Sequence, residues 1–211
     1  MVGILVAEFE LQVKSGVKIG AVGPRFVDRR QNPPLVHPFL RLDVFGSGHR
    51  YCASNEDVIV VDTLITSGCL TSLNVLDSVG LMDAGYFVDY TDIEWSFRAK
   101  FKGFILLGIC RVQMTHELGH GQIRKIFGIN LIEYSPIRRY YYARNTISVS
   151  RLKYVSMRWK VRLILGLLLR FLTLPWAPRA NNKLLWPEFH MLLLGFFDGI
   201  RRVRGSLRNS K

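Results

Sequence analysis

The chain has 211 residues, of which 49% are hydrophobic and 21% are charged. This balance excludes an intrinsically disordered chain and suits one domain with or without an appendage. The formal net charge of +13 is unevenly placed, because residues 138–211 carry a net +14 while residues 1–137 carry −1. The basic segment therefore needs an explanation of its own.

Three cysteines, Cys52, Cys69 and Cys110, are widely spaced along the chain. No two have the spacing of a metal-binding pair, and their odd number argues against a disulfide framework. Residues 1–13 lack the basic start of a secretory signal peptide. We therefore expect free thiols in a reducing, cytoplasmic setting.

Apolar periodicity and turn residues predict alternating helices and strands, which favours an α/β fold. The chain should begin with a helix over 1–15, with Leu5, Phe9 and Val13 on its apolar face, and continue with a strand over 17–22 that Gly23-Pro24 breaks. A loop or hairpin over 28–55 and a buried strand over 58–66 should follow. We then expect a helix from Leu73 to Val79, capped by Ser72 and closed by Gly80, a helix over 92–101 and a strand over 104–114.

The helix over 92–101 has an acidic start. Thr91 and Glu94 have the spacing of a capping box, which places Asp92 at the first helical position. A helix N-terminus favours an ionised carboxylate, and an ionised, well-oriented Asp92 can accept a proton from a hydroxyl group. The alternative is an ordinary acidic first turn with no chemical role.

Residues 87–98, Phe-Val-Asp-Tyr-Thr-Asp-Ile-Glu-Trp-Ser-Phe-Arg, followed by Gly103, resemble the acceptor-side acidic motif of family 2 glycosyltransferases, and most closely their rhamnosyltransferase branch. Supporting stretches occur in the family's order at residues 21–25, 64–68, 79–83, 116–119 and 135–145. The resemblance implies the C-terminal part of a GT-A (nucleotide-diphospho-sugar transferase) fold, here incomplete. It also implies inverting transfer of a sugar such as rhamnose, with Asp92 as the general base.

The family's N-terminal nucleotide-binding half, with its Asp-x-Asp motif, has no counterpart before residue 17. We therefore expect a truncated or split enzyme. The implied donor is a nucleotide-sugar such as dTDP-rhamnose. The implied acceptor is a lipid-linked glycan or a cell-surface polysaccharide such as an O-antigen.

The resemblance also assigns candidate site residues. It places the donor sugar and the acceptor near Ser67, Gly68, Asp89, Glu94 and Trp95. A tight turn that needs glycine at position 68 is the alternative for the first pair.

His116 would join the shell of a divalent metal ion. Mg²⁺ prefers oxygen ligands, so Mn²⁺ would suit an imidazole better. The alternative is a polar histidine at the end of a strand.

Arg138 and Arg139, and less specifically Arg144, are interleaved with the tyrosines at 140–142. Guanidinium groups can bind a diphosphate with two hydrogen bonds. The alternative is a helix whose tyrosines pack on the core and whose arginines face solvent. For the tyrosines we favour this alternative.

We expect two parts, a transferase part over residues 1–147 and a helical, basic tail over residues 148–211. Its apolar runs are too short to span a membrane. Arg151, Arg158 and Arg162 share a helix face, and tryptophans bracket the apolar runs. This pattern predicts a helix in the membrane interface, at the cytoplasmic face of a bacterial inner membrane. Packing on the α/β core is the alternative.

Two other functions remain open. The chain could be a non-catalytic, membrane-associated remnant or subunit that binds a glycan acceptor or a protein partner. Nucleic-acid binding would follow from charge alone, and we predict none, because the basic residues lie among long apolar runs.

Overall fold

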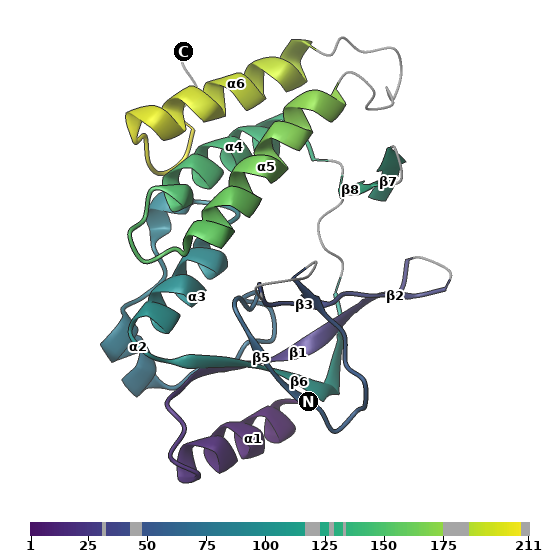
Figure 1. The fold of residues 1–211 in the computed structure, drawn as a ribbon, viewed down its shortest axis with the longest axis vertical. Coiled ribbons are helices and arrows are strands. Elements are labelled where there is room, and N and C mark those ends of the chain that lie inside the picture. Colours follow the sequence, from purple (N-terminus) through teal and green to yellow (C-terminus); the bar gives the residue numbers. More distant parts are fainter. Residues whose placement is uncertain are drawn as a thin grey trace. The chain divides into compact units, whose positions relative to one another are not determined.

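A computed structural model of the chain describes residues 1–30, 33–42, 48–116, 123–126, 129–132, 134–174 and 186–207 (Figure 1). The chain forms two compact units: Met1–Asp83 with Asp92–Leu118, and Ala84–Thr91 with Gly119–Lys211. The units divide after residue 118, and the short segment 84–91 belongs to the second unit. The boundary expected after residue 147, between a transferase part and a basic tail, stays a prediction.

A four-stranded mixed sheet forms the centre of the first unit. β1 (Ile19–Asp28) and β6 (Ile105–Thr115) lie parallel in its middle, with an antiparallel strand at each edge. The strand order is β2-β1-β6-β5, with β2 at Leu35–Val36 and β5 at Val58–Val61. A separate antiparallel ribbon consists of β3 (Phe39–Leu40) and β4 (His49–Arg50).

Helices cover both faces of this sheet (Figure 1). α1 (Val2–Lys14) packs Leu5 against Leu107, while α3 (Thr91–Phe101) packs Trp95 and Ala99 in a second core with Leu106. Neighbouring strand residues point to opposite faces, so Leu106 and Leu107 serve different cores. The expected α/β class is confirmed, while the GT-A assignment stays a prediction.

Several local predictions are confirmed. The first helix and the strand over 104–114 are present as α1 and β6. α2 (Leu73–Val79) begins at Ser72, whose hydroxyl accepts a hydrogen bond from the Val75 amide at 3.3 Å, and it ends at Gly80. The described residues between 29 and 55 form only short strands, as a loop or hairpin should.

Two strand predictions were wrong in extent. β1 does not stop at Gly23-Pro24 but continues to Asp28. Its register against β6 shifts between Pro24 and Arg25, so the proline lies at an irregularity where a missing N–H is tolerated. The strand expected over 58–66 ends at Val61, and Val58 and Val60 are each 37% exposed because β5 lies at the sheet edge.

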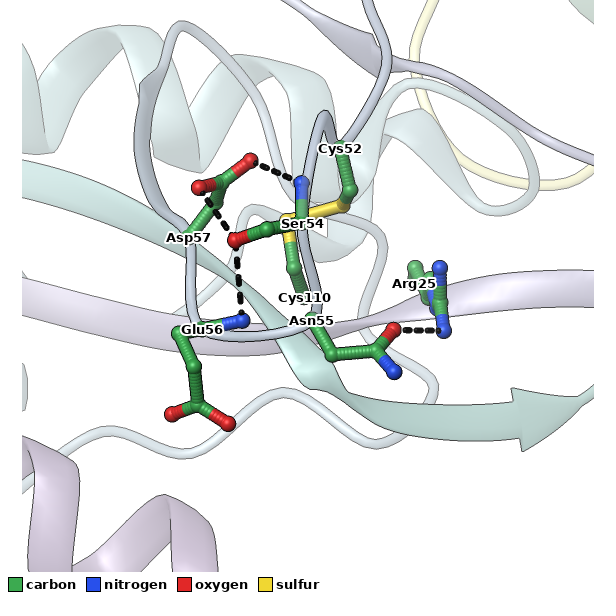
Figure 2. The surroundings of a disulfide bond; sticks show 7 residues. All are labelled: Arg25, Cys52, Ser54, Asn55, Glu56, Asp57 and Cys110. Carbon is green, nitrogen blue, oxygen red and sulfur yellow. Dashed lines mark hydrogen bonds between the residues drawn. A yellow bond between two sulfur atoms is a disulfide. The ribbon is translucent and has the colours of Figure 1, made fainter.

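The expectation of free cysteines was also wrong, because Cys52 and Cys110 form a disulfide with a Cα–Cα distance of 5.8 Å (Figure 2). The chain turns back before β5, where the Asp57 carboxylate accepts hydrogen bonds from the Ser54 amide at 2.7 Å and hydroxyl at 2.8 Å. The Cys110 amide then donates to the Asp57 carbonyl at 3.1 Å. This pairing brings Cys52 over Cys110 across 58 positions of sequence.

The second unit contains α4 (Pro136–Ser150), α5 (Met157–Thr173) and α6 (Trp186–Arg201), which pack together. Their shared core contains Ala143, Ile147, Leu167 and Leu192. α4 and α6 approach closely where α6 has glycines: a Cβ on Gly199 would lie 2.8 Å from the Arg144 carbonyl oxygen, and one on Gly195 would clash with the Tyr140 backbone. The backbones of β7 (Ile123–Ile126) and β8 (Ile129–Ile132) pair in antiparallel orientation.

The disulfide predicts a thiol count. Protein purified without reductant and unfolded in guanidinium should release one reactive thiol, Cys69, and three after reduction. A Cys52→Ser variant should lose about 2–4 kcal/mol of unfolding free energy, because the crosslink restricts the unfolded chain. Cys69→Ser is the matched control and should keep the crosslink. Three thiols without reductant would contradict the disulfide.

Candidate active site

The residues just before α3 have a strained backbone. Phe87, Asp89 and Tyr90 adopt positive φ angles of 64°, 58° and 67°. Left-handed conformations cost non-glycine residues roughly 1–2 kcal/mol each, although Asp tolerates them better than most. Strain of this kind persists only where the surroundings impose it, and it concentrates at functional sites. The segment therefore marks a candidate site within the acidic motif.

Asn145 of α4 is one group that imposes this conformation. Its side-chain amide donates to the carbonyl oxygens of Tyr86 at 3.1 Å, Val88 at 2.8 Å and Asp89 at 3.0 Å. Asn145 is 1% exposed, so these bonds are shielded from water. One side chain thus bridges three successive parts of the strained segment.

Arg144 is a second such group. It is 1% exposed, and its guanidinium donates to the Tyr86 carbonyl oxygen at 2.7 Å and lies 4.9 Å from the centroid of the Tyr141 ring. It also donates to the carbonyl of Gly205. The sequence left open whether Arg144 binds phosphate or faces solvent. In the structure its guanidinium does neither and instead donates hydrogen bonds to backbone carbonyls.

Two further contacts complete the hold on this segment. The Tyr90 hydroxyl lies 2.7 Å from the Thr146 hydroxyl, and burial raises the pKa of Tyr90 well above its ordinary value. Arg138 donates two hydrogen bonds to the Asp89 carboxylate, at 2.7 and 3.0 Å. That hydrogen bonding raises the pKa of Arg138. Arg138 and Asp89, predicted to bind diphosphate and acceptor respectively, therefore pair with each other.

The second predicted diphosphate ligand, Arg139, is also paired. It is 5% exposed and forms an ion pair with Glu188 of α6. Its role in this structure is to join two helices of the second unit. The tyrosines pack inward as expected, since Tyr140 and Tyr141 are 0% and 3% exposed.

Asp92 lies in the first unit, beside a tight turn. One carboxylate oxygen accepts from the Ile93 amide at 2.8 Å, and the other accepts from the Thr66 amide at 3.4 Å. The turn closes with the Cys69 amide donating to the Thr66 carbonyl at 3.1 Å. Gly68 has a φ of 68°, so the turn needs glycine at this position. The sequence offered such a tight turn as the alternative to a sugar-binding role. Ser67 and Gly68 therefore lie in the turn whose Thr66 amide contacts Asp92, and their role at a sugar site stays a prediction.

Cys69 reports on the environment of this carboxylate. Its thiol pKa is raised to about 12, first by burial and then by the negative charge of Asp92. A thiol so shifted stays protonated at neutral pH and has no nucleophilic role there.

The predicted capping box is not the arrangement found. α3 begins at Thr91, so this residue lies inside the helix. Both carboxylate oxygens of Glu94 accept from Arg98, at 2.8 and 2.9 Å, and Glu94 is 2% exposed. Arg98 also donates to the carbonyls of Val79 and Leu81 at 2.9 Å. Glu94 therefore orients an arginine that ties α3 to the end of α2.

Trp95, predicted at the acceptor site, is 3% exposed and packs in the core of the first unit. Its indole N–H donates to the Gly80 carbonyl at 2.8 Å. In this structure Trp95 fixes the position of α3 and presents almost no surface to a ligand.

His116 follows β6, and its amide donates to the Val27 carbonyl at 3.2 Å. Its ring lies 5.7 Å from that of Phe26. Nearby, burial lowers the pKa of His37, while Asp28 is held by Arg30. Within the described part of the chain, no three His, Cys, Asp or Glu side chains group as metal ligands would. The described residues therefore do not form the predicted metal site around His116.

Asn145 was missed as a site residue, and it supplies a sharp test. Asn145→Ala removes the donors to two or more buried carbonyls and should cost about 2–4 kcal/mol of unfolding free energy. Asn145→Asp should cost more, because a carboxylate would face three carbonyl oxygens. Urea unfolding measures the free energy, and chymotrypsin cleavage after Phe87, which is 58% exposed, reports release of the segment.

The matched control is Asn74→Asp on the exposed side of α2. It should change stability by less than about 0.5 kcal/mol. Equal stability of the Asn145 and Asn74 variants, with unchanged cleavage at Phe87, would show that the amide does not hold the segment.

Comparison with known proteins finds similarity to the dTDP-rhamnosyl transferase RfbF of Shigella flexneri. The two are 31% identical over 187 residues, which cover 88% of this chain and 61% of the transferase. The chain thus spans about three-fifths of the length of that relative. No protein-family model matches the chain, and neither does any solved structure. Over most of its own length, the chain is therefore similar to a rhamnosyltransferase-type glycosyltransferase.

Proposed function

We propose that this chain forms the acceptor-side part of a family 2 type, inverting glycosyltransferase with a GT-A fold. It transfers rhamnose or a related deoxyhexose from a dTDP-sugar to a glycan acceptor. The observation that carries the proposal is the similarity to a dTDP-rhamnosyl transferase across 88% of the chain. The geometry adds a carboxylate, that of Asp92, at a helix N-terminus beside a tight turn.

Asp92 acts as the general base. As the acceptor hydroxyl attacks the anomeric carbon, its proton passes to the Asp92 carboxylate. The new oxygen–carbon bond forms while the bond from that carbon to the diphosphate breaks, and dTDP leaves. The dipole of α3 and two backbone N–H groups favour the ionised carboxylate before the reaction. Ser67 and Gly68, in the adjoining turn, position the reacting sugar.

The other predicted residues act in support. Arg138 and Arg139 are paired with Asp89 and Glu188, and the described residues around His116 offer no three-ligand metal set. A divalent cation would stabilise the departing diphosphate. In this proposal the chain activates the acceptor, and Glu94 and Trp95 hold α3 in place.

The second unit contacts the membrane surface through α5. Met157, Val161, Leu165, Leu168 and Leu172 are 50–70% exposed and follow one helix face. The opposite face packs Leu163 and Leu167 inward, with Trp159, so this tryptophan is not interfacial in this structure.

Arg158 and Lys160 flank the exposed apolar stripe, and a basic, apolar face complements an anionic lipid surface. No helix in the described ranges has the length and hydrophobicity needed to cross a bilayer.

This surface would place the enzyme on a lipid-linked acceptor at the cytoplasmic face of a bacterial inner membrane. A disulfide is unusual in that compartment. The thiol count of protein isolated from its own cells therefore bears on the location as well as on the fold.

A chimaera tests the catalytic proposal. In it, this chain replaces the 187 matched residues of the Shigella flexneri transferase. Membranes from cells lacking that transferase supply the acceptor, and labelled dTDP-rhamnose supplies the donor. Asp92→Asn should lower transfer by about 10²–10⁴-fold, as loss of a general base does. Donor affinity, measured calorimetrically, should stay within about twofold, because Asp92 acts on the acceptor.

Asp77→Asn, an exposed change on α2, is the matched control and should leave transfer unchanged. Transfer by Asp92→Asn at more than about a tenth of the parent rate would remove Asp92 from the base role.

The membrane proposal predicts vesicle binding. The chain should float with vesicles that contain phosphatidylglycerol, and less so as salt rises. Leu165→Ser with Leu168→Ser should weaken this binding about tenfold or more, since each leucine loses apolar burial. Leu73→Ser with Leu81→Ser is the matched control, as these leucines are 78% and 75% exposed outside α5. Equal loss in both pairs would contradict a specific role for α5.

A further inference from the structure

The segment that follows α2 presents two exposed apolar side chains close to Asp92. Leu81 is 75% exposed and Met82 is 37% exposed. Thr66 connects this segment to the carboxylate, because its amide donates to Asp92 at 3.4 Å and its hydroxyl donates to the Met82 sulfur at 3.8 Å. All four residues belong to the first unit. Met82 and Asp92 are therefore neighbours of the same residue.

The backbone before Met82 is held by α3, the helix that begins beside Asp92. Side chains of α3 donate hydrogen bonds to three successive backbone carbonyls of the segment. These bonds run from Arg98 to Val79 at 2.9 Å, from Trp95 to Gly80 at 2.8 Å, and from Arg98 to Leu81 at 2.9 Å. Because one helix positions both the carboxylate and the segment, the place of Met82 beside Asp92 is built into the fold.

This arrangement gives two predicted acceptor residues an indirect role. Glu94 orients Arg98 with hydrogen bonds at 2.8 and 2.9 Å, and Trp95 is buried. Both residues act through the backbone that presents Met82. An exposed apolar side chain is ordinary on a protein surface. Met82 differs because its backbone is fixed and because it shares Thr66 with the proposed base.

We propose that Met82 contacts the C6 methyl group of the transferred deoxyhexose and so determines which sugar is accepted. This inference rests on the proposed function, in which Asp92 takes the proton of the attacking hydroxyl. Reacting atoms lie roughly 3–3.5 Å apart before transfer, so the transferred sugar must come next to that hydroxyl. Met82 is then the apolar group that the sugar meets beside Thr66.

The chemistry of the side chain fits a methyl group. A thioether is flexible and polarizable, and it packs well against apolar groups. A hexose carries a hydroxyl on the same carbon. The methionine sulfur is only a weak acceptor, so that hydroxyl would lose its hydrogen bonds to water without a good replacement. The contact therefore favours a deoxyhexose over the matching hexose.

Methionine-methyl NMR of the whole chain, labelled with carbon-13, tests the contact. The chain has five methionines, and the signal that is missing in Met82→Leu belongs to Met82. The methyl glycoside of L-rhamnose should shift this signal saturably and leave the signal of Met157, which is 70% exposed on α5, unchanged. The methyl glycoside of L-mannose adds only the 6-hydroxyl and should bind about tenfold more weakly. An unmoved Met82 signal, or equal affinity for the two sugars, would refute the contact.

The chimaera tests the same contact during transfer. The measured quantity is the ratio of kcat/KM for dTDP-rhamnose to kcat/KM for its 6-hydroxy analogue. Met82→Gln should lower this ratio about tenfold, while Met82→Leu should keep it within about threefold. Leu73→Gln, a change at a leucine that is 78% exposed at the start of α2, is the matched control and should leave the ratio unchanged. An unchanged ratio in Met82→Gln would reject Met82 as a specificity residue.

The two measurements separate this inference from the proposed function. The titration needs no turnover. A saturable Met82 shift in a chain whose chimaera transfers no sugar would keep the sugar contact and reject the proposed function. Transfer that depends on Asp92, with no response of Met82 to either sugar, would do the reverse.

Discussion

The side-chain amide of Asn145 is the constraint on which the conformation of the acidic motif depends. Three left-handed residues at 87–90 cost several kcal/mol in a free chain. Asn145 and Arg144 offset that cost, because their donors meet the carbonyls that such a backbone turns toward α4. The segment that precedes Asp92 is therefore held by two side chains of α4 that lie more than fifty positions later in the sequence. A change in α4 can alter the motif without touching any of its side chains.

The acidic motif holds three carboxylates with unlike surroundings. Asp89 and Glu94 each accept two hydrogen bonds from one arginine, which makes them parts of the structure. Asp92 accepts hydrogen bonds from the backbone amides of Ile93 and Thr66, and these amides orient its carboxylate at the start of α3. The proposed proton transfer needs a carboxylate held in this way.

Sequence could predict what short-range physics decides. The Ser72 cap, the Gly80 stop and the strand over 104–114 depend on residues a few positions apart, and each is present. The Cys52–Cys110 disulfide and the Asn145–Val88 hydrogen bond join residues 58 and 57 positions apart, which no local pattern encodes. The capping box failed for a different reason. Arg98, four positions after Glu94, competes with Thr91, three positions before it, and burial favours the charged partner.

The basic segment shows how composition misleads when one function is assigned to all its charge. Arg139 and Arg144 are buried, and they pair with a residue of another helix and with backbone carbonyls respectively. They are therefore not available to contact a membrane surface. Arg151, Arg202 and Arg204 line a pocket of about 360 Å³ at the ends of α4 and α6, and Arg158 with Lys160 flanks the exposed apolar stripe of α5. The described basic residues of 138–211 therefore divide into structural, pocket and surface groups. Because buried guanidinium groups are shielded from salt, only the exposed basic residues should make binding to an anionic surface depend on ionic strength.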